Sequence, residues 1–221
     1  MIGAPVINDI DRRVAPDLVS ALSEVPTPII GDVFGRLSGM QGLRRFDRNG
    51  RRAGSAFTVR VRPGDNLYLH KALHMAQPGD MLVVDGAGDV GNALIGEIMM
   101  RQAVARGLAG FVIDGAVRDI GAFREGPVLC LARAHSLRGP FKTGPGEINT
   151  PVVVGGTTVT PGDVVVADDD GVIVVPASDA AAALAAAKDR MAEEERLLAD
   201  IACGREDNAW IDAMIYPNGA N

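Results

Sequence analysis

The sequence has few cysteines, no long apolar run and no excess of positive charge. Its two cysteines, Cys130 and Cys203, lack the spacing of a metal site and are typical of incidental thiols in a reducing compartment. No apolar segment approaches the roughly 20 residues that a membrane helix needs. The formal net charge of −6 gives nucleic-acid binding no electrostatic support. The first residues, MIGAPVINDIDRR, do not read as a signal peptide, because their charges follow the apolar residues. We therefore expect a cytoplasmic enzyme or binding protein that contacts neither nucleic acid nor a membrane.

The composition predicts one globular domain. Hydrophobic residues make up 47% of the chain and charged residues 23%, which are ordinary values, and 221 residues can enclose a sizeable core. No linker or change of composition divides the sequence, so we expect residues 1–221 to form a single domain.

The stretch from Pro78 to Ile120 predicts a strand, a helix and a second strand. The apolar run 81–84 is typical of a strand buried on both faces. Residues 92–106 have helical length and one apolar side, and Gly107 suits the position after a helix. Residues 111–113 form the next expected strand. Such strands run parallel with a right-handed crossover, and ligands bind beyond their carboxyl ends.

Three charged residues should meet at that edge of the sheet. Glu97 lies on the first turns of the expected helix, and Arg118 and Asp119 follow the second strand. Adjacent residues of an extended strand point to opposite faces, so Arg118 and Asp119 can share a ligand only if the chain turns. Gly115-Ala116-Val117 after the strand and a helical turn starting near Asp119 would allow that turn. A structural ion pair between Glu97 and Arg118 is the alternative interpretation.

Three glycines in the same unit permit a different hypothesis. Gly86, Gly88 and Gly91 have the spacing of a dinucleotide fingerprint, and Asp114 ends the next strand. The same geometry would suit a methyl-donor cofactor, whereas three glycines can also simply form a flexible turn. A Rossmann domain needs further strand–helix units after Asp114, but this chain continues with hairpins and one terminal helix, which weakens the cofactor hypothesis.

The flanking segments predict further elements. We expect helices at 16–22, 27–39, 65–76 and 178–202, and strands at 55–61, 127–132, 151–154, 157–159, 164–167 and 172–175. Strand 55–61 alternates apolar and polar residues, which predicts one wet face. His70 and His74 could form a metal-binding helix face, but no third ligand completes it, so packing is the simpler interpretation. The apolar tail around Trp210 should contact another subunit or fold back onto its own chain.

One motif consists of Gly96-Glu97-Ile98-Met99 with Arg118-Asp119 further along, and twenty residues separate Glu97 from Arg118. In this motif the sequence resembles the RraA-like family. That family includes class II pyruvate aldolases that cleave 4-hydroxy-4-methyl-2-oxoglutarate and 4-carboxy-4-hydroxy-2-oxoadipate. The resemblance extends from about Pro28 to Pro176. It implies an α/β/α sandwich of the swivelling-domain-like type, and a trimer or hexamer with active sites between subunits. The helix and tail at 178–221 would then lie at a subunit contact.

The resemblance also implies a mechanism and its residues. Asp119 would bind Mg2+ or Mn2+ directly, and Glu97 would hold a metal-bound water. The cation would take the keto oxygen and carboxylate of a small 2-oxo acid and stabilise the pyruvate enolate formed on cleavage. Arg118 would donate to the enolate oxygen, and the backbone at Gly96, Ile98 and Met99 would bind the carboxylate. The same chemistry would decarboxylate oxaloacetate as a side activity.

Two other functions stay open. One branch of the family regulates a ribonuclease by binding it and lacks the aspartate of the Arg-Asp pair. Because Asp119 is present here, the resemblance favours the aldolase over a non-catalytic protein-binding regulator. A methyltransferase with a nucleotide cofactor is the weaker alternative. The contacts to the distal half of the substrate are not evident; Arg138 and Lys142 are candidates.

Overall fold

The structure is a computed structural model that describes residues 5–205 and 207–217. The helices are α1 (Pro16–Ser23), α2 (Thr27–Val33), α3 (Leu67–Met75), α4 (Glu97–Ala105), α5 (Ile120–Glu125), α6 (Ala180–Ala202) and α7 (Ala209–Ile215). The strands are β1 (Val6–Ile7), β2 (Arg44–Arg45), β3 (Arg52–Val61), β4 (Asp80–Asp85), β5 (Ala93–Ile95), β6 (Gly110–Val117), β7 (Leu129–His135), β8 (Gly146–Ile148), β9 (Val152–Val154), β10 (Thr157–Val159), β11 (Val164–Ala167) and β12 (Val172–Val175). Within the described ranges, none of these helices has both the length and the apolar character needed to cross a membrane.

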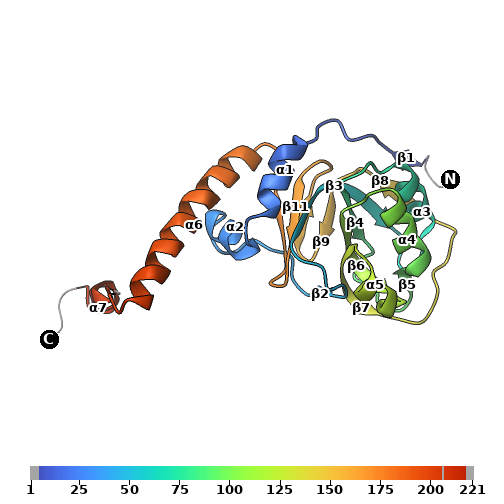
Figure 1. Cartoon of the computed structure of the whole chain (residues 1–221). Coiled ribbons are helices and arrows are strands. Elements are labelled where there is room, and N and C mark those ends of the chain that lie inside the picture. The colour runs from blue at the N-terminus through green and yellow to red at the C-terminus, as the bar shows by residue number, and fades with distance from the viewer. Residues whose placement is uncertain (1–4, 206, 218–221) are drawn as a thin grey trace.

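A ten-stranded mixed sheet organises the molecule, with the order β1-β8-β3-β4-β6-β7-β2 (Figure 1). Its centre is parallel: β3 pairs with β4, β4 with β6, and β6 with β7. Strand β11 pairs antiparallel with β3 and β12, and β5 pairs with β6. The hairpin β9–β10 forms a separate two-stranded sheet. The expected α/β class and the buried parallel strand at 81–84 are confirmed.

Both faces of the central sheet are covered. On one face, α3, α4 and α5 enclose a core that includes Phe57, Phe111 and Phe123. On the other face, the β9–β10 hairpin packs over Val83 and Val112. The prediction of a wet face on the strand at 55–61 was wrong, because both sides of β3 are covered. The polar Thr58 is fully buried there and donates its hydroxyl to the Thr150 carbonyl at 2.6 Å.

The helix expected at 92–106 begins later than its apolar pattern predicted. Residues Ala93–Ile95 form β5, which lies beside β6, and Gly96 has extended backbone with φ −156°. Helix α4 therefore begins at Glu97, which takes its first helical position. Leu94 and Ile95 are buried in the core. Short apolar runs occur in buried strands and in buried helices alike, so the apolar pattern alone could not distinguish a strand from a helix here.

Helix α6 extends beyond the body of the protein (Figure 1). Its first turns pack against α1 and α2 through Ala180, Ala183 and Ala187, whose small side chains permit close approach. We call residues 188–205 and 207–217 the C-terminal arm. Leu198 on α6 is 64% exposed and Trp210 on α7 is 62% exposed, and α7 has no buried residue among those described. The tail therefore does not fold back onto its own chain.

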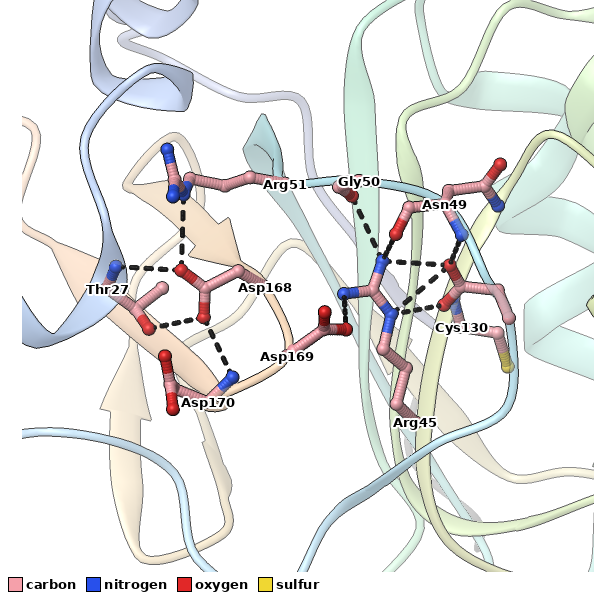
Figure 2. A network of polar contacts seen from close by, with 10 residues as sticks. Thr27, Arg45, Asn49, Gly50, Arg51, Cys130, Asp168, Asp169 and Asp170 are labelled. Atoms are coloured by element: carbon pink, nitrogen blue, oxygen red, sulfur yellow. Dashed lines mark hydrogen bonds and ion pairs between the residues drawn. The ribbon is translucent and has the colours of Figure 1, made fainter.

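A polar network joins α2 to the sheet (Figure 2). The buried Asp168 accepts hydrogen bonds from the backbone and hydroxyl of Thr27, from Arg51 Nε and from the Asp170 backbone. Burial alone would raise the pKa of Asp168, but these hydrogen bonds lower it below its ordinary value. Arg45 bridges Asp169 to the neighbouring loop. Asp168 therefore organises the β11–β12 turn through hydrogen bonds to protein groups.

Candidate active site

Arg118 and Asp119 lie at the carboxyl end of β6. The strand continues through Val117 with an irregularity after Ile113, so residues 115–117 belong to the strand and do not form part of the turn. The helical turn expected near Asp119 is confirmed, since Asp119 has left-handed backbone (φ 56°, ψ 42°) and precedes α5. Arg118 is held by its backbone N–H, which donates to the Ile95 carbonyl at 3.0 Å. This turn directs two adjacent side chains toward one region.

The amino terminus of α4 meets this turn. Asp119 Oδ2 accepts a hydrogen bond from the Glu97 backbone N–H at 2.9 Å and lies 3.7 Å from Arg118 Nε. Gly96 makes the approach possible, since a Cβ at this position would lie 2.4 Å from Asp119 Oδ2 and 2.9 Å from Arg118 Cγ. The structure therefore brings the pair Gly96 and Glu97 together with the pair Arg118 and Asp119, although the two pairs are more than twenty positions apart in sequence.

The Glu97 side chain faces along its own helix. Its Oε1 accepts from Arg101 Nε at 2.8 Å, an i,i+4 pair on the exposed side of α4. The alternative of a structural ion pair between Glu97 and Arg118 was wrong: Arg118 is paired with Asp119 instead. Because the Glu97–Arg101 pair is solvent-exposed, it is weak, and the Glu97 carboxylate can exchange it for another partner.

The first turn of α4 offers backbone donors to an anion. Ile98 is 70% exposed, whereas Met99 is buried in the core. The backbone N–H groups at the beginning of a helix have no carbonyl partner within it, and the helix dipole favours negative charge there. The backbone of Gly96, Ile98 and Met99 is therefore placed where a carboxylate could be bound.

A cleft of about 350 Å³ opens in front of these groups. Gly96, Ile98, Met99 and Arg118 form one side, and Arg118 Nη1 approaches the loop at Gly139. Asn66, His70 and Lys142 line the rest of the cleft. This volume suits a small molecule.

Asp65 positions the loop that carries Lys142. The Asp65 carboxylate accepts from the Thr143 backbone at 2.6 Å, the Thr143 hydroxyl at 2.9 Å, the Gly144 backbone at 3.0 Å and the Leu67 backbone at 3.0 Å. Burial alone would raise the pKa of Asp65, but these four hydrogen bonds lower it below its ordinary value. One buried carboxylate thus fixes both the start of α3 and the loop that carries Lys142.

His70 and Asn66 complete that part of the cleft. Burial, followed by the charges of Lys142 and His74, lowers the pKa of His70, which favours its neutral form. Asn66 donates to the Leu94 carbonyl at 2.9 Å, while its buried Oδ1 has no donor among the described residues. No local sequence signal predicts this group, because it depends on the distant segments 64–66 and 139–144 lying side by side.

The site suits a hard divalent cation. The described residues contain no cluster of three or more His, Cys, Asp or Glu side chains that could hold a metal ion, so a site rich in protein ligands is excluded there. Mg2+ and Mn2+ need only one or two carboxylates, because they retain several waters. Asp119 is 44% exposed at its side chain, and its Oδ1 accepts no hydrogen bond from the described residues. The missing Cβ of Gly96 gives the Asp119 carboxylate the room to lie against the beginning of α4.

The glycine stretch lies at the end of β4 and leads into β5, so no helix follows it directly. Gly86 packs against β6, since a Cβ there would lie 2.8 Å from the Asp114 carbonyl oxygen. The Asp114 carboxylate is paired with Arg133. The spacing of a dinucleotide fingerprint is present, but its required position at a helix amino terminus is not.

Comparisons with known proteins identify the family of this chain. Residues 19–174 match the RraA-like family, described as Aldolase/RraA. A protein of Halalkalibacterium halodurans named putative 4-hydroxy-4-methyl-2-oxoglutarate aldolase is 36% identical over 208 residues, covering 91% of this chain and 97% of the relative. The chain belongs to the RraA-like family.

Two further relatives support the assignment to the RraA-like family. A 4-hydroxy-4-methyl-2-oxoglutarate aldolase of Thermus thermophilus is 39% identical over 120 residues, covering 54% of this chain and 73% of the relative. The crystal structure of Streptomyces coelicolor RraAS2, described as an unusual member of the RNase ES inhibitor RraA protein family, superimposes with a TM-score of 0.76 at 31% identity. It covers 83% of this chain and 96% of that chain. The fold expected from the resemblance is confirmed.

Proposed function

We propose that this RraA-like protein is a metal-dependent pyruvate aldolase, a carbon–carbon lyase. Its substrate would be 4-hydroxy-4-methyl-2-oxoglutarate or 4-carboxy-4-hydroxy-2-oxoadipate, and its products pyruvate and a second oxo acid. The observation that carries this proposal is the convergence of Arg118 and Asp119 on the amino terminus of α4. The names of two relatives point to the same reaction.

Each residue has a distinct task in this reaction. Asp119 would hold Mg2+ or Mn2+ directly, and Glu97 would hold it through water after leaving Arg101. The cation supplies Lewis acidity toward the 2-keto oxygen. Arg118 donates to that oxygen as negative charge develops, when the C3–C4 bond breaks. The backbone N–H groups of Ile98 and Met99 orient the adjacent carboxylate, so that the scissile bond faces the cleft.

The segments that contribute His70 and Lys142 would bind the rest of the substrate. Lys142 places a flexible positive charge in the same cleft as Arg118, which suits a second carboxylate. His70 in its neutral form can accept a proton, as the C4 hydroxyl requires during cleavage. This arrangement favours substrates that carry a carboxylate at each end.

We further propose that the protein is a trimer, or a hexamer of two trimers. The C-terminal arm exposes Leu197, Leu198, Trp210 and Met214, and an apolar surface of this kind is typical of a subunit contact. In this arrangement the described residues 178–205 and 207–217 belong to the same single domain and join it to a neighbour; the rest of the segment expected at the subunit contact, residues 206 and 218–221, lies outside the described residues.

A protein-binding regulator is the second candidate, because the Streptomyces relative is described as a member of an RNase ES inhibitor family. The placement of Asp119 favours catalysis, since its carboxylate lies beside Arg118 and retains an oxygen that accepts no hydrogen bond from the described residues. A non-catalytic regulator would not need that arrangement.

The test is a pyruvate-release assay with a panel of 4-hydroxy-2-oxo acids, with and without Mg2+ or Mn2+. We expect turnover of at least one diacid, loss of turnover with EDTA, recovery on adding metal, and slow decarboxylation of oxaloacetate. Full activity in a chelated sample would contradict the metal mechanism, and borohydride trapping would then test a lysine Schiff base. Release of pyruvate from none of the panel would favour the regulator.

A further inference from the structure

A second cleft lies at the opposite end of the parallel strands. Its volume is about 430 Å³, and it is enclosed by α1, the beginning of β3 and the turn at 77–80. Ser55 and Asp80, which are paired in register at the amino-terminal end of β4, form its floor. The candidate active site lies beyond the carboxyl ends of these strands. Because a six-residue strand spans about 20 Å, the two clefts are separate sites.

The second cleft carries an excess of positive charge. Arg13, Arg51 and Arg52 line it, and Asp80 is the acidic residue among its lining groups. Asp80 is neutralised by both terminal nitrogens of Arg13 and also accepts from the Gln77 backbone at 2.8 Å. On a chain whose formal net charge is −6, this local excess of cations favours an anionic ligand.

The three arginines differ in what they can still bind. Both terminal nitrogens of Arg13 are occupied by Asp80. Arg51 donates from Nε to Asp168 at 3.1 Å, as Figure 2 shows, and from Nη1 to the Glu24 carbonyl at 2.8 Å. Arg52 is exposed, and within the described ranges it has no acidic partner. Its planar fork of donors matches the geometry of a carboxylate or phosphate group.

Ser55 supplies an independent indication of a ligand. Its side chain is buried, with 7% of the residue exposed, and its hydroxyl has no hydrogen-bond partner among the described residues. Buried polar groups are nearly always paired, so an unpaired hydroxyl lining a cleft calls for a partner from outside the chain. The hydroxyl can donate to an anion.

We propose that this cleft binds a small organic anion. Its carboxylate or phosphate group accepts a hydrogen bond from Ser55 and is attracted by the positive charge of Arg52, and its short aliphatic body lies along Pro16, Val19 and Pro78. Clefts that combine an apolar lining with a few placed polar groups are typical of small-molecule sites. This site is independent of the proposed aldolase reaction, and its test requires no turnover.

Ligand-detected saturation-transfer NMR on the full-length protein tests the proposal. The probes are butyrate and monobutyl phosphate, which share one aliphatic body and differ in the anionic group, with butylammonium as the charge-reversed control. Titrations are made with the native protein, Arg52→Gln and Ser55→Ala. Arg48→Gln serves as the matched control, because Arg48 is exposed but does not line the cleft. All titrations are repeated in an Arg118→Ala background to remove binding at the active site.

We expect at least one anion to bind, with affinity about tenfold weaker in Arg52→Gln and reduced in Ser55→Ala. Binding should be unchanged in Arg48→Gln and absent for butylammonium. Whichever of the two anions binds with higher affinity shows whether the cleft prefers a carboxylate or a phosphate group. Ser55→Ala should keep or raise the melting temperature, because it removes an unpaired buried hydroxyl. Equal affinity in native protein, Arg52→Gln and Ser55→Ala, or binding of neither anion at millimolar concentration, would overturn the proposal.

Discussion

Gly96→Ala should strongly reduce activity while leaving the fold intact. The backbone at Gly96 is extended, with φ −156°, so alanine can adopt it without strain. The obstacle is the new Cβ, which would lie 2.4 Å from Asp119 Oδ2 and 2.9 Å from Arg118 Cγ. Ordinary contact begins at 3.4 Å, so the Asp119 carboxylate must move by about 1.0 Å.

The structure sets the size of the effect. A displacement of about 1 Å in a catalytic group can cost roughly a hundredfold in rate. Asp119 and Arg118 are 44% and 41% exposed at their side chains, so both can rotate into solvent and relieve the clash. We therefore expect kcat to fall about a hundredfold, with a melting temperature close to that of the native protein.

Gly121→Ala is the matched control. Gly121 lies in α5, two residues after Asp119, and a Cβ added there would meet no described atom within 4 Å beyond its chain neighbours and its own helix backbone. Alanine there should raise stability by about 0.5–1 kcal/mol through helix propensity and leave kcat unchanged. Pyruvate release and thermal unfolding are measured on both variants. Near-native kcat in a folded Gly96→Ala protein would refute the assignment of Asp119 and Arg118 to the reaction.

Three further predictions concern the surrounding residues. Arg118→Ala should keep metal affinity but lower kcat about a hundredfold, and Arg118→Lys should not restore it, whereas Asp119→Asn should lose metal binding and activity together; metal titration and steady-state kinetics separate these cases. Lys142→Ala should raise KM for a diacid more than for a substrate analogue without the distal carboxylate, and equal effects on both would remove Lys142 from substrate binding. The folded-state pKa of Asp65 is lowered, so its contribution to stability is present above the unfolded pKa of about 4 and is lost as pH falls through the folded value. Asp65→Asn should therefore flatten the decline of unfolding free energy in acid, and an unchanged acid profile would contradict this role.

The sequence was sufficient to predict the central unit of the fold. The apolar run at 81–84 and the expected strand before Arg118 placed Glu97, Arg118 and Asp119 at one edge of the sheet, because buried parallel strands have a simple pattern. The structure brings these three residues together there. The same pattern misplaced the beginning of α4. Ala93–Ile95 pairs with β6 as a strand, and this pairing depends on a tertiary neighbour that local periodicity does not reveal.

The rest of the cleft could not be predicted in the same way. His70 and Lys142 are separated by about seventy positions along the chain and meet because Asp65 binds the loop at 143–144. The turn near Asp119 was expected, but its left-handed backbone was not, since a left-handed residue other than glycine leaves little trace in sequence. Long-range hydrogen bonds and single-residue backbone conformations were thus the parts that sequence alone did not reveal.

The length of the projecting part of α6 sets both the distance of α7 from the rest of the protein and the direction in which the apolar side of α7 faces. Residues 188–202 rise about 1.5 Å each, so they carry α7 about 22 Å beyond the last alanine packed on α2. Each residue also rotates the helix by about 100°, so removing two residues from this stretch would turn the apolar side of α7 away from its original direction. Removing seven would nearly preserve that direction and shorten the reach by about 10 Å. Length and direction in this arm are therefore coupled, and natural changes in its length are expected to occur in steps of whole helical turns.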